Sequence, residues 1–201
     1  MANKLIPALM ALCALTLSLP VYASNLGLQF QTGRYAIDSE VAEREGIEDS
    51  GFSLGFDAYT VLANHVRLGG GFFTVFTEDH ESYSVMVEDQ NGNVSEADSS
   101  AAVGSFYGEA GLTARPLPWL VTDLTAGYGV GLSTRTVSNC MDCPGEKLDV
   151  PIGAYIKPRV SYVHAMTDDG YFNIGLEYVG FLGESGMENG IMLNLGLFVD
   201  F

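Results

Sequence analysis

The chain has 201 residues, of which 47% are hydrophobic, 24 are glycine and only 17% are charged, and its formal net charge at pH 7 is −16. A polypeptide this acidic repels nucleic acids and other polyanions, so we expect no nucleic-acid partner. No segment after the first 23 residues approaches the roughly 18 uninterrupted apolar residues that a transmembrane helix needs. A closed β-structure reconciles the apolar composition with the many glycines, because it satisfies every backbone group even in lipid.

Residues 1–23 have the pattern of a cleavable secretory signal peptide. Lys4 precedes an apolar stretch, and the small residues Val21 and Ala23 fit a cleavage site. The apolar stretch is too short to span a membrane comfortably as a helix. We therefore expect an exported protein made of residues 24–201, with a formal charge of −17 because cleavage removes one lysine.

Residues 24–201 alternate apolar with small or polar positions, and this period of two is typical of β-strands. For example, Phe52, Leu54 and Phe56 alternate with Ser53 and Gly55. The pattern predicts eight strands, at about residues 25–36, 51–62, 66–76, 106–114, 120–132, 152–162, 172–178 and 190–201. The first strand is the least regular, because Arg34 falls on its apolar face, which would fit a slip of register there.

The two faces of these strands distinguish a membrane barrel from a soluble one. The face opposite the apolar one is dominated by glycine, with a few charges of both signs. This suits a narrow lumen and leaves the apolar face to contact lipid. A soluble barrel, with its apolar face inward, is the alternative. The expected connections alternate in length, as in outer-membrane barrels with short periplasmic turns and long extracellular loops. The short ones are 63–65, 116–118 and 166–170, and the long ones are 38–50, 78–101, 135–149 and 183–189.

The last strand is an alternating apolar run that ends on the aromatic residue Phe201. Together with the signal peptide, the eight strands and the alternating connections, it resembles the small outer-membrane barrels of Gram-negative bacteria, the group of the OmpA membrane domain, the OmpX/Ail type and the opacity-type proteins. The resemblance implies an all-β, eight-stranded antiparallel transmembrane barrel surrounded by outer-membrane lipid and lipopolysaccharide. It also implies that the barrel assembly machinery recognises the C-terminal strand, with Phe201 as the signal. A closed barrel has no free edge, so we expect a monomer.

Several charged residues fall on the inward positions of the expected strands. Six of them lie at a similar height above the periplasmic ends and a seventh, Arg67, lies lower but within reach. The set is Asp57, Arg67, Glu109, Asp123, Lys157, Arg159 and Glu177. Because an unpaired buried charge is costly, we expect these groups to pair in one layer across the lumen. The layer would act either as a plug or as a gate for small solutes, and the narrow lumen of eight strands favours the plug.

The four long connections contain 18 of the 25 acidic residues. They predict a solvated anionic surface that could contact cationic partners or weakly held divalent ions. The third connection carries Cys140 and Cys143, which we expect to form a disulfide in an oxidising compartment. Zinc would need two further ligands, and we expect no metal or cofactor site.

An enzymatic role has one candidate stretch, because some outer-membrane barrels of this size are lipid A hydrolases or acyltransferases. Asp79-His80-Glu81-Ser82 contains the residue types for acyl transfer, but consecutive residues rarely converge on one reacting atom. His164 has no serine two residues away on its strand. We therefore expect no enzyme, but a structural and surface-interaction protein that acts through its acidic loops. A narrow small-solute channel and a lipid A-modifying enzyme are the alternatives.

Overall fold

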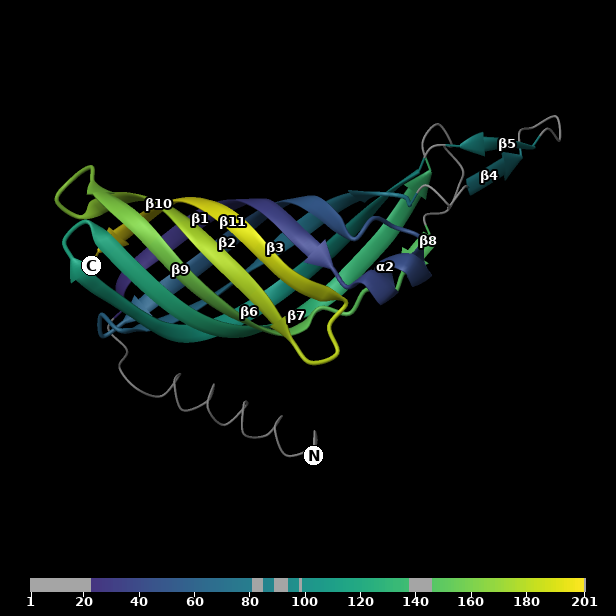
Figure 1. Cartoon of the computed structure of the whole chain (residues 1–201). Coiled ribbons are helices and arrows are strands. Elements are labelled where there is room, and N and C mark those ends of the chain that lie inside the picture. Colours follow the sequence, from purple (N-terminus) through teal and green to yellow (C-terminus); the bar gives the residue numbers. More distant parts are fainter. Residues whose placement is uncertain (1–22, 81–84, 89–93, 98, 138–145, 201) are drawn as a thin grey trace.

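The computed structural model describes residues 23–80, 85–88, 94–97, 99–137 and 146–200, and its long strands form one closed antiparallel sheet (Figure 1). The elements are β1 (Ala23–Ile37), α2 (Ser39–Glu45), β2 (Ser50–Leu62), β3 (Val66–Glu78), β4 (Val85–Glu88), β5 (Val94–Ala97), β6 (Ser99–Leu117), β7 (Leu120–Val137), β8 (Glu146–Leu148), β9 (Gly153–Ala165), β10 (Gly170–Leu182) and β11 (Met187–Asp200). Among the described residues, no helix has the length and apolar composition needed to span a membrane.

Within those residues, eight strands form the barrel wall in the order β1-β2-β3-β6-β7-β9-β10-β11, and β11 pairs with β1 to close it. The eight predicted strands and the closed antiparallel barrel are therefore confirmed. β6 and β7 extend further than predicted, because they continue to pair with each other as far as Ser99 and Val137. The short strand β8 adds to the end of β7, and β4 and β5 form a separate two-stranded sheet.

The predicted register slip at Arg34 is wrong. Arg34 pairs with Phe52 of β2 and with Ile191 of β11, without a break in either register. Its side chain stays on the outer face, where it donates a hydrogen bond to Ser50 Oγ at 2.7 Å. The strand therefore carries a polar residue outward at this height in unbroken register, and its pairing with β11 shifts only further on, between Ala36 and Ile37.

The two ends of the barrel differ in their connections. At one end, which we call the turn end, the connections span residues 63–65, 118–119 and 166–169. At the opposite end, which we call the loop end, lie α2 and β8 (Figure 1). α2 begins after Asp38, whose carboxylate accepts hydrogen bonds from the backbone N–H of Glu40 and Val41, and it ends at Gly46 in the left-handed conformation.

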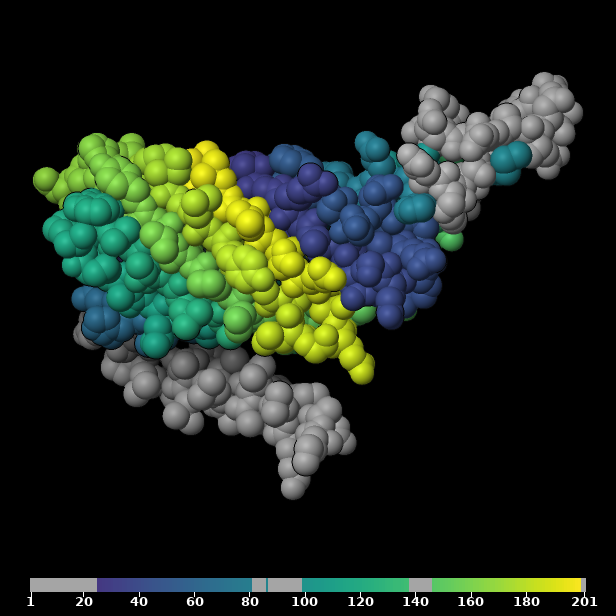
Figure 2. Space-filling model, viewed as in Figure 1, coloured from purple at the N-terminus to yellow at the C-terminus, as the bar shows by residue number. Residues whose placement is uncertain are grey.

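The outer surface of the wall is apolar on every strand of the barrel. In Figure 2, β11 crosses this surface diagonally as a yellow band. Exposed outward side chains include Leu26, Leu28, Phe30, Phe52, Phe56, Phe72, Phe76, Phe106, Leu112, Leu124, Tyr128, Val130, Leu132, Ile156, Val160, Tyr162, Ile174, Leu176, Tyr178, Ile191, Leu193, Leu195, Leu197 and Val199. A continuous apolar belt of this size is far larger than soluble monomers expose, so the barrel is a transmembrane one and the soluble alternative is excluded.

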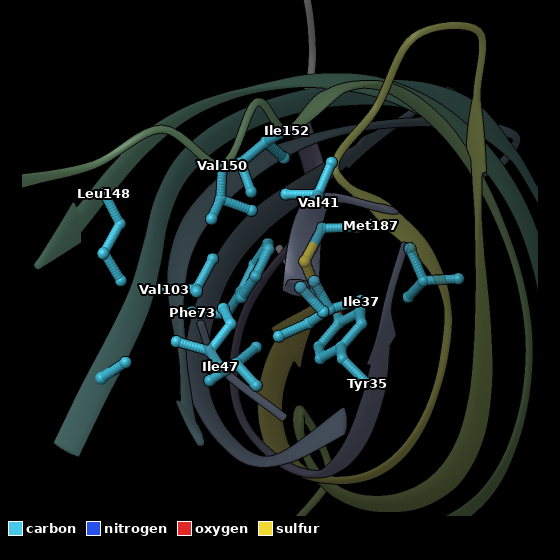
Figure 3. Close-up of a cluster of buried hydrophobic side chains, with 14 of the residues drawn as sticks. Tyr35, Ile37, Val41, Ile47, Phe73, Val103, Leu148, Val150, Ile152 and Met187 are labelled. Carbon is cyan, nitrogen blue, oxygen red and sulfur yellow. The ribbon is translucent and has the colours of Figure 1, made fainter. Parts of the chain in front are cut away.

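The loop-end half of the interior is packed with apolar side chains, contrary to the expectation of a glycine-rich inner face. Tyr35, Phe73 and Val103 point inward from the wall, and Val41 and Ile47 from the first connection pack against them (Figure 3). We call this group the apolar filling; it comprises Tyr35, Ile37, Val41, Ala42, Ile47, Phe73, Val75, Ala101, Val103, Leu148, Val150, Ile152, Tyr155, Val179, Met187 and Met192. Side chains rather than open space therefore occupy this half of the barrel.

A buried arginine holds the connections together at the loop end. Arg135 of β7 bonds to Asp79 Oδ1 at 2.9 Å and to Glu146 Oε2 at 2.6 Å. It also donates to the backbone carbonyls of Glu45 and Gly46 at the end of α2. One guanidinium therefore joins segments from three separate connections over the apolar filling.

Candidate functional site: the polar interior

The strand register brings the seven charged residues predicted for the lumen together inside the barrel. They come from β2 (Asp57), β3 (Arg67), β6 (Glu109), β7 (Asp123), β9 (Lys157 and Arg159) and β10 (Glu177), and all of them are buried. Their heights agree because the strands are in register: Asp123 lies directly opposite Arg159, and Arg159 directly opposite Glu177. We call these seven residues the charged cluster.

Two cations and three carboxylates form the centre of the charged cluster. Arg67 Nη2 lies 2.7 Å from Asp57 Oδ2, and Arg67 Nε lies 3.3 Å from Glu109 Oε1. Lys157 Nζ lies 2.6 Å from the other oxygen of Glu109, 3.6 Å from Glu177 Oε1 and 3.9 Å from Asp57 Oδ2. Each cation is therefore shared between carboxylates of different strands, which ties five strands of the wall (β2, β3, β6, β9 and β10) together across the lumen.

The second part of the charged cluster is the pair of Arg159 and Asp123. Arg159 Nε lies 2.7 Å from Asp123 Oδ2, and Arg159 Nη2 contacts the same oxygen. Gln29 of β1 connects the two parts, because its Oε1 accepts hydrogen bonds from Arg67 and Arg159. Gln29 was not among the residues predicted for the lumen, although its inward position in β1 was the available signal.

Aromatic rings and glycines shape the space around the charges. The guanidinium of Arg67 lies 3.6 Å from the ring centroid of Tyr59, in a cation–π contact. The Tyr59 ring in turn lies over Gly27, where an added Cβ would come within 2.1 Å of the ring. Gly27 is therefore needed for close approach, since any larger residue would push Tyr59 away from Arg67.

We expect the substitution Gly27→Ala to lower the free energy of unfolding by about 1–3 kcal/mol, the usual cost of overpacking a filled interior. The matched control is Gly108→Ala on β6, because an added Cβ there meets no atom within 4 Å. Urea unfolding in detergent micelles, followed by the fluorescence of the single tryptophan Trp119, measures both. Equal stability of the two variants would contradict the close-packing argument.

The space on either side of the charged cluster is unequal. Toward the loop end, the cluster meets Tyr107 and Tyr155, whose rings contact each other edge to face. The cavity there, between Lys157 and the apolar filling, measures only about 10 Å³, which is the volume of a single water probe. Toward the turn end, the lumen opens into a cavity of about 610 Å³. The charged cluster therefore lies between a filled half and a hollow half of the barrel.

The three histidines lie apart from one another. His65 is in the turn between β2 and β3, His164 is exposed on the outer face of β9, and His80 follows β3 at the loop end. The Asp79 carboxylate beside His80 binds Arg135. Within the part of the chain that the structure describes, no three His, Cys, Asp or Glu side chains are grouped to hold a metal ion. Ser82, Cys140, Cys143 and Phe201, and with them the predicted disulfide and C-terminal signal, lie outside the described residues.

The closed wall, the apolar exterior and the buried polar interior define an eight-stranded transmembrane β-barrel. No family model and no curated protein matches the chain. Among solved structures, it is similar to Neisserial surface protein A, with 13% identity and a TM-score of 0.49 over 89% of this chain and 98% of that one. It is also similar to Ail of Yersinia pestis, in complex with a heparin analogue, with 11% identity and a TM-score of 0.48 over 88% and 97% of the two chains. A third is the N-terminal barrel domain of Pseudomonas aeruginosa OprF, with 12% identity and a TM-score of 0.38 over 89% and 98%.

Proposed function

We propose that this chain is a non-enzymatic barrel of the Gram-negative outer membrane that does not conduct and that acts through its surface. The observation that carries the proposal is that two groups of side chains, the charged cluster and the apolar filling, occupy the interior one after the other. Lys157 and Arg67 are each shared between buried carboxylates, Arg159 pairs with Asp123, and the apolar filling occupies the lumen between them and the loop end. An eight-stranded barrel is narrow enough for side chains to close it completely.

The loop end would face the cell exterior and present an acidic surface. On α2, Val41 and Ala42 pack inward, whereas Glu40 and Glu43 are exposed on the opposite side. The carboxylates would meet cationic partners directly, or the phosphates of lipopolysaccharide through divalent ions. Assembly would use the C-terminal strand and the barrel assembly machinery, and the closed wall supports a monomer.

The histidine positions support a role without catalysis. A lipid-modifying enzyme would need a histidine within hydrogen-bond reach of a serine and a carboxylate. His164 lies among outward apolar side chains such as Tyr162, and Asp79, one of the two carboxylates adjacent to His80 in sequence, is engaged by Arg135.

Single-channel recording of the purified barrel in a planar bilayer tests the proposal. We expect no discrete openings from the wild type, because the filled lumen leaves no continuous water path. The double variant Lys157→Ala, Arg159→Ala removes two cations of the charged cluster but keeps the apolar filling, so we expect at most brief openings from it. The matched control, Arg34→Ala with Lys147→Ala, removes two positive charges at exposed positions and should stay silent.

A heat-modifiability gel confirms that each variant is folded before recording. Discrete wild-type openings, with an ion selectivity that shifts in the Lys157→Ala, Arg159→Ala variant, would make the chain a narrow small-solute channel and overturn the proposal. A silent wild type would leave the surface of the loop end as the functional part of the molecule.

A further inference from the structure

The hollow half of the barrel is a cavity of about 610 Å³ that opens at the turn end. Arg67 and Arg159 of the charged cluster line its inner part, and Arg115 of β6 lies at its mouth. Tyr59 and Phe198 belong to an apolar group that forms part of its wall. The volume matches that of pockets for small molecules.

The charged groups that line the cavity are mostly positive, although the chain as a whole carries a net charge of −16. Three arginines line it against one carboxylate, that of Asp123. The carboxylates of Asp57 and Glu109, which pair with Arg67, are not among the lining residues. A solute in the cavity therefore meets guanidinium groups first.

Three buried polar atoms of the lining residues, on Arg67, Ser161 and Asn25, have no hydrogen-bond partner among the described residues. Arg67 Nη1 is one of them, and the Arg67 side chain is only 1% exposed. The second is Ser161 Oγ of β9, on a residue that is 2% exposed. The third is Asn25 Oδ1 of β1, an acceptor that needs a donor, such as a hydroxyl group of the ligand. A buried donor without a partner costs free energy, and an oxygen atom of a ligand would supply the missing acceptor.

We propose that this cavity binds a small organic anion, a carboxylate or a phosphate ester that carries a compact apolar group. The anionic oxygens accept hydrogen bonds from Arg67 Nη1 and Ser161 Oγ, while the apolar group packs against Tyr59 and Phe198. Guanidinium groups bind both anions well because their donors match the spacing of the oxygens. The solute enters from the turn end, which is the periplasmic side in the orientation proposed above.

A cation or a neutral apolar molecule fits the cavity less well. A cation would lie beside three arginines, and Asp123, the only carboxylate among the described lining residues, is already engaged by Arg159. A neutral apolar molecule would leave Arg67 Nη1 and Ser161 Oγ without partners. Asp168 and Asp169 are in the exposed turn between β9 and β10, and neither lines the cavity.

Methyl NMR of the valine-labelled barrel in zwitterionic detergent micelles tests the proposal with three probes that share a phenyl ring. They are phenyl phosphate (anionic), benzylammonium (cationic) and benzyl alcohol (neutral). Val61, Val121 and Val163 line the cavity, while Val75 and Val103 in the apolar filling serve as internal controls. We expect saturable shifts from phenyl phosphate at the cavity valines only, and at least about fivefold weaker binding of the other two probes.

Substitutions then locate the bound anion. We expect Arg115→Gln to weaken phenyl phosphate binding about two- to fivefold, as the loss of one partly exposed charge should. Arg34→Gln, which makes the same change on the outer face, should leave binding unchanged. Ser161→Ala should weaken binding by a similar factor without disturbing the charged cluster, because Ser161 Oγ has no partner there.

Three results would overturn the proposal. They are binding of benzylammonium as strong as that of phenyl phosphate, shifts spread equally over the cavity and the apolar filling, and no saturable shift at the cavity valines. This measurement does not depend on conduction, so a barrel that conducts and still binds phenyl phosphate would contradict the proposed function alone.

Discussion

Replacing Lys157 by methionine should lower the free energy of unfolding by about 3–5 kcal/mol, because it removes one partner of a buried ion-pair network. Methionine keeps most of the side-chain volume but leaves Glu109 and Glu177 without their shared cation. Urea unfolding in micelles or lipid vesicles, followed by Trp119 fluorescence, gives the difference. Lys147→Met is the matched control, since Lys147 is exposed on β8 and should change stability by less than about 0.5 kcal/mol.

A second substitution separates the cost of the lone carboxylates from the cost of losing the lysine. In the double variant Lys157→Met, Glu177→Gln, the carboxylate that loses its ion pair with Lys157 becomes neutral, and we expect recovery of at least about 1 kcal/mol relative to Lys157→Met alone. If Lys157→Met behaved like Lys147→Met, or if the two substitutions were simply additive, the charges would not form one coupled network.

One pattern, the alternation of apolar with small or polar residues, predicted both the barrel and the positions of its inward charges. Strand alternation has a period of two, so Asp57, Arg159 and Glu177 had to share a face with the glycines once the outer face was known. A closed barrel of eight strands then brings that face together in a narrow space. The charged residues were also easy to recognise, because charges are rare on the membrane strands of this chain.

The apolar filling could not be predicted in the same way. Near the loop end, both faces of the strands are apolar, so alternation no longer distinguishes inside from outside: Phe72 and Phe73 are adjacent aromatic residues that point in opposite directions. In β1, Arg34 falls on the apolar outer face, which suggested a register slip at that residue, whereas the register with β11 shifts only between Ala36 and Ile37.

Contacts between distant segments were beyond the reach of local patterns. Arg135 meets Asp79, which lies 56 residues away in the sequence, and the end of α2, about 90 residues away. No spacing rule connects these positions, and only the strand pairing of the closed wall brings them together at the loop end. Gln29 was missed for a simpler reason, because it carries no charge and the search for inward groups followed charge.

Phe72 and Phe73 offer the sharpest test of which residues fill the barrel. We expect Phe73→Ala to lower the free energy of unfolding by about 3–5 kcal/mol, because it opens a cavity in the apolar filling where Phe73 stacks on Tyr35 at 4.9 Å between ring centroids. Phe72→Ala removes the same atoms from the outer face, where lipid chains close the gap, and should cost about 1 kcal/mol or less. Because the two residues are adjacent on β3, strand propensity is the same for both, and urea unfolding in lipid vesicles compares them directly. Equal losses, or a larger loss for Phe72→Ala, would mean that lipid contact rather than the interior packing stabilises this part of the wall.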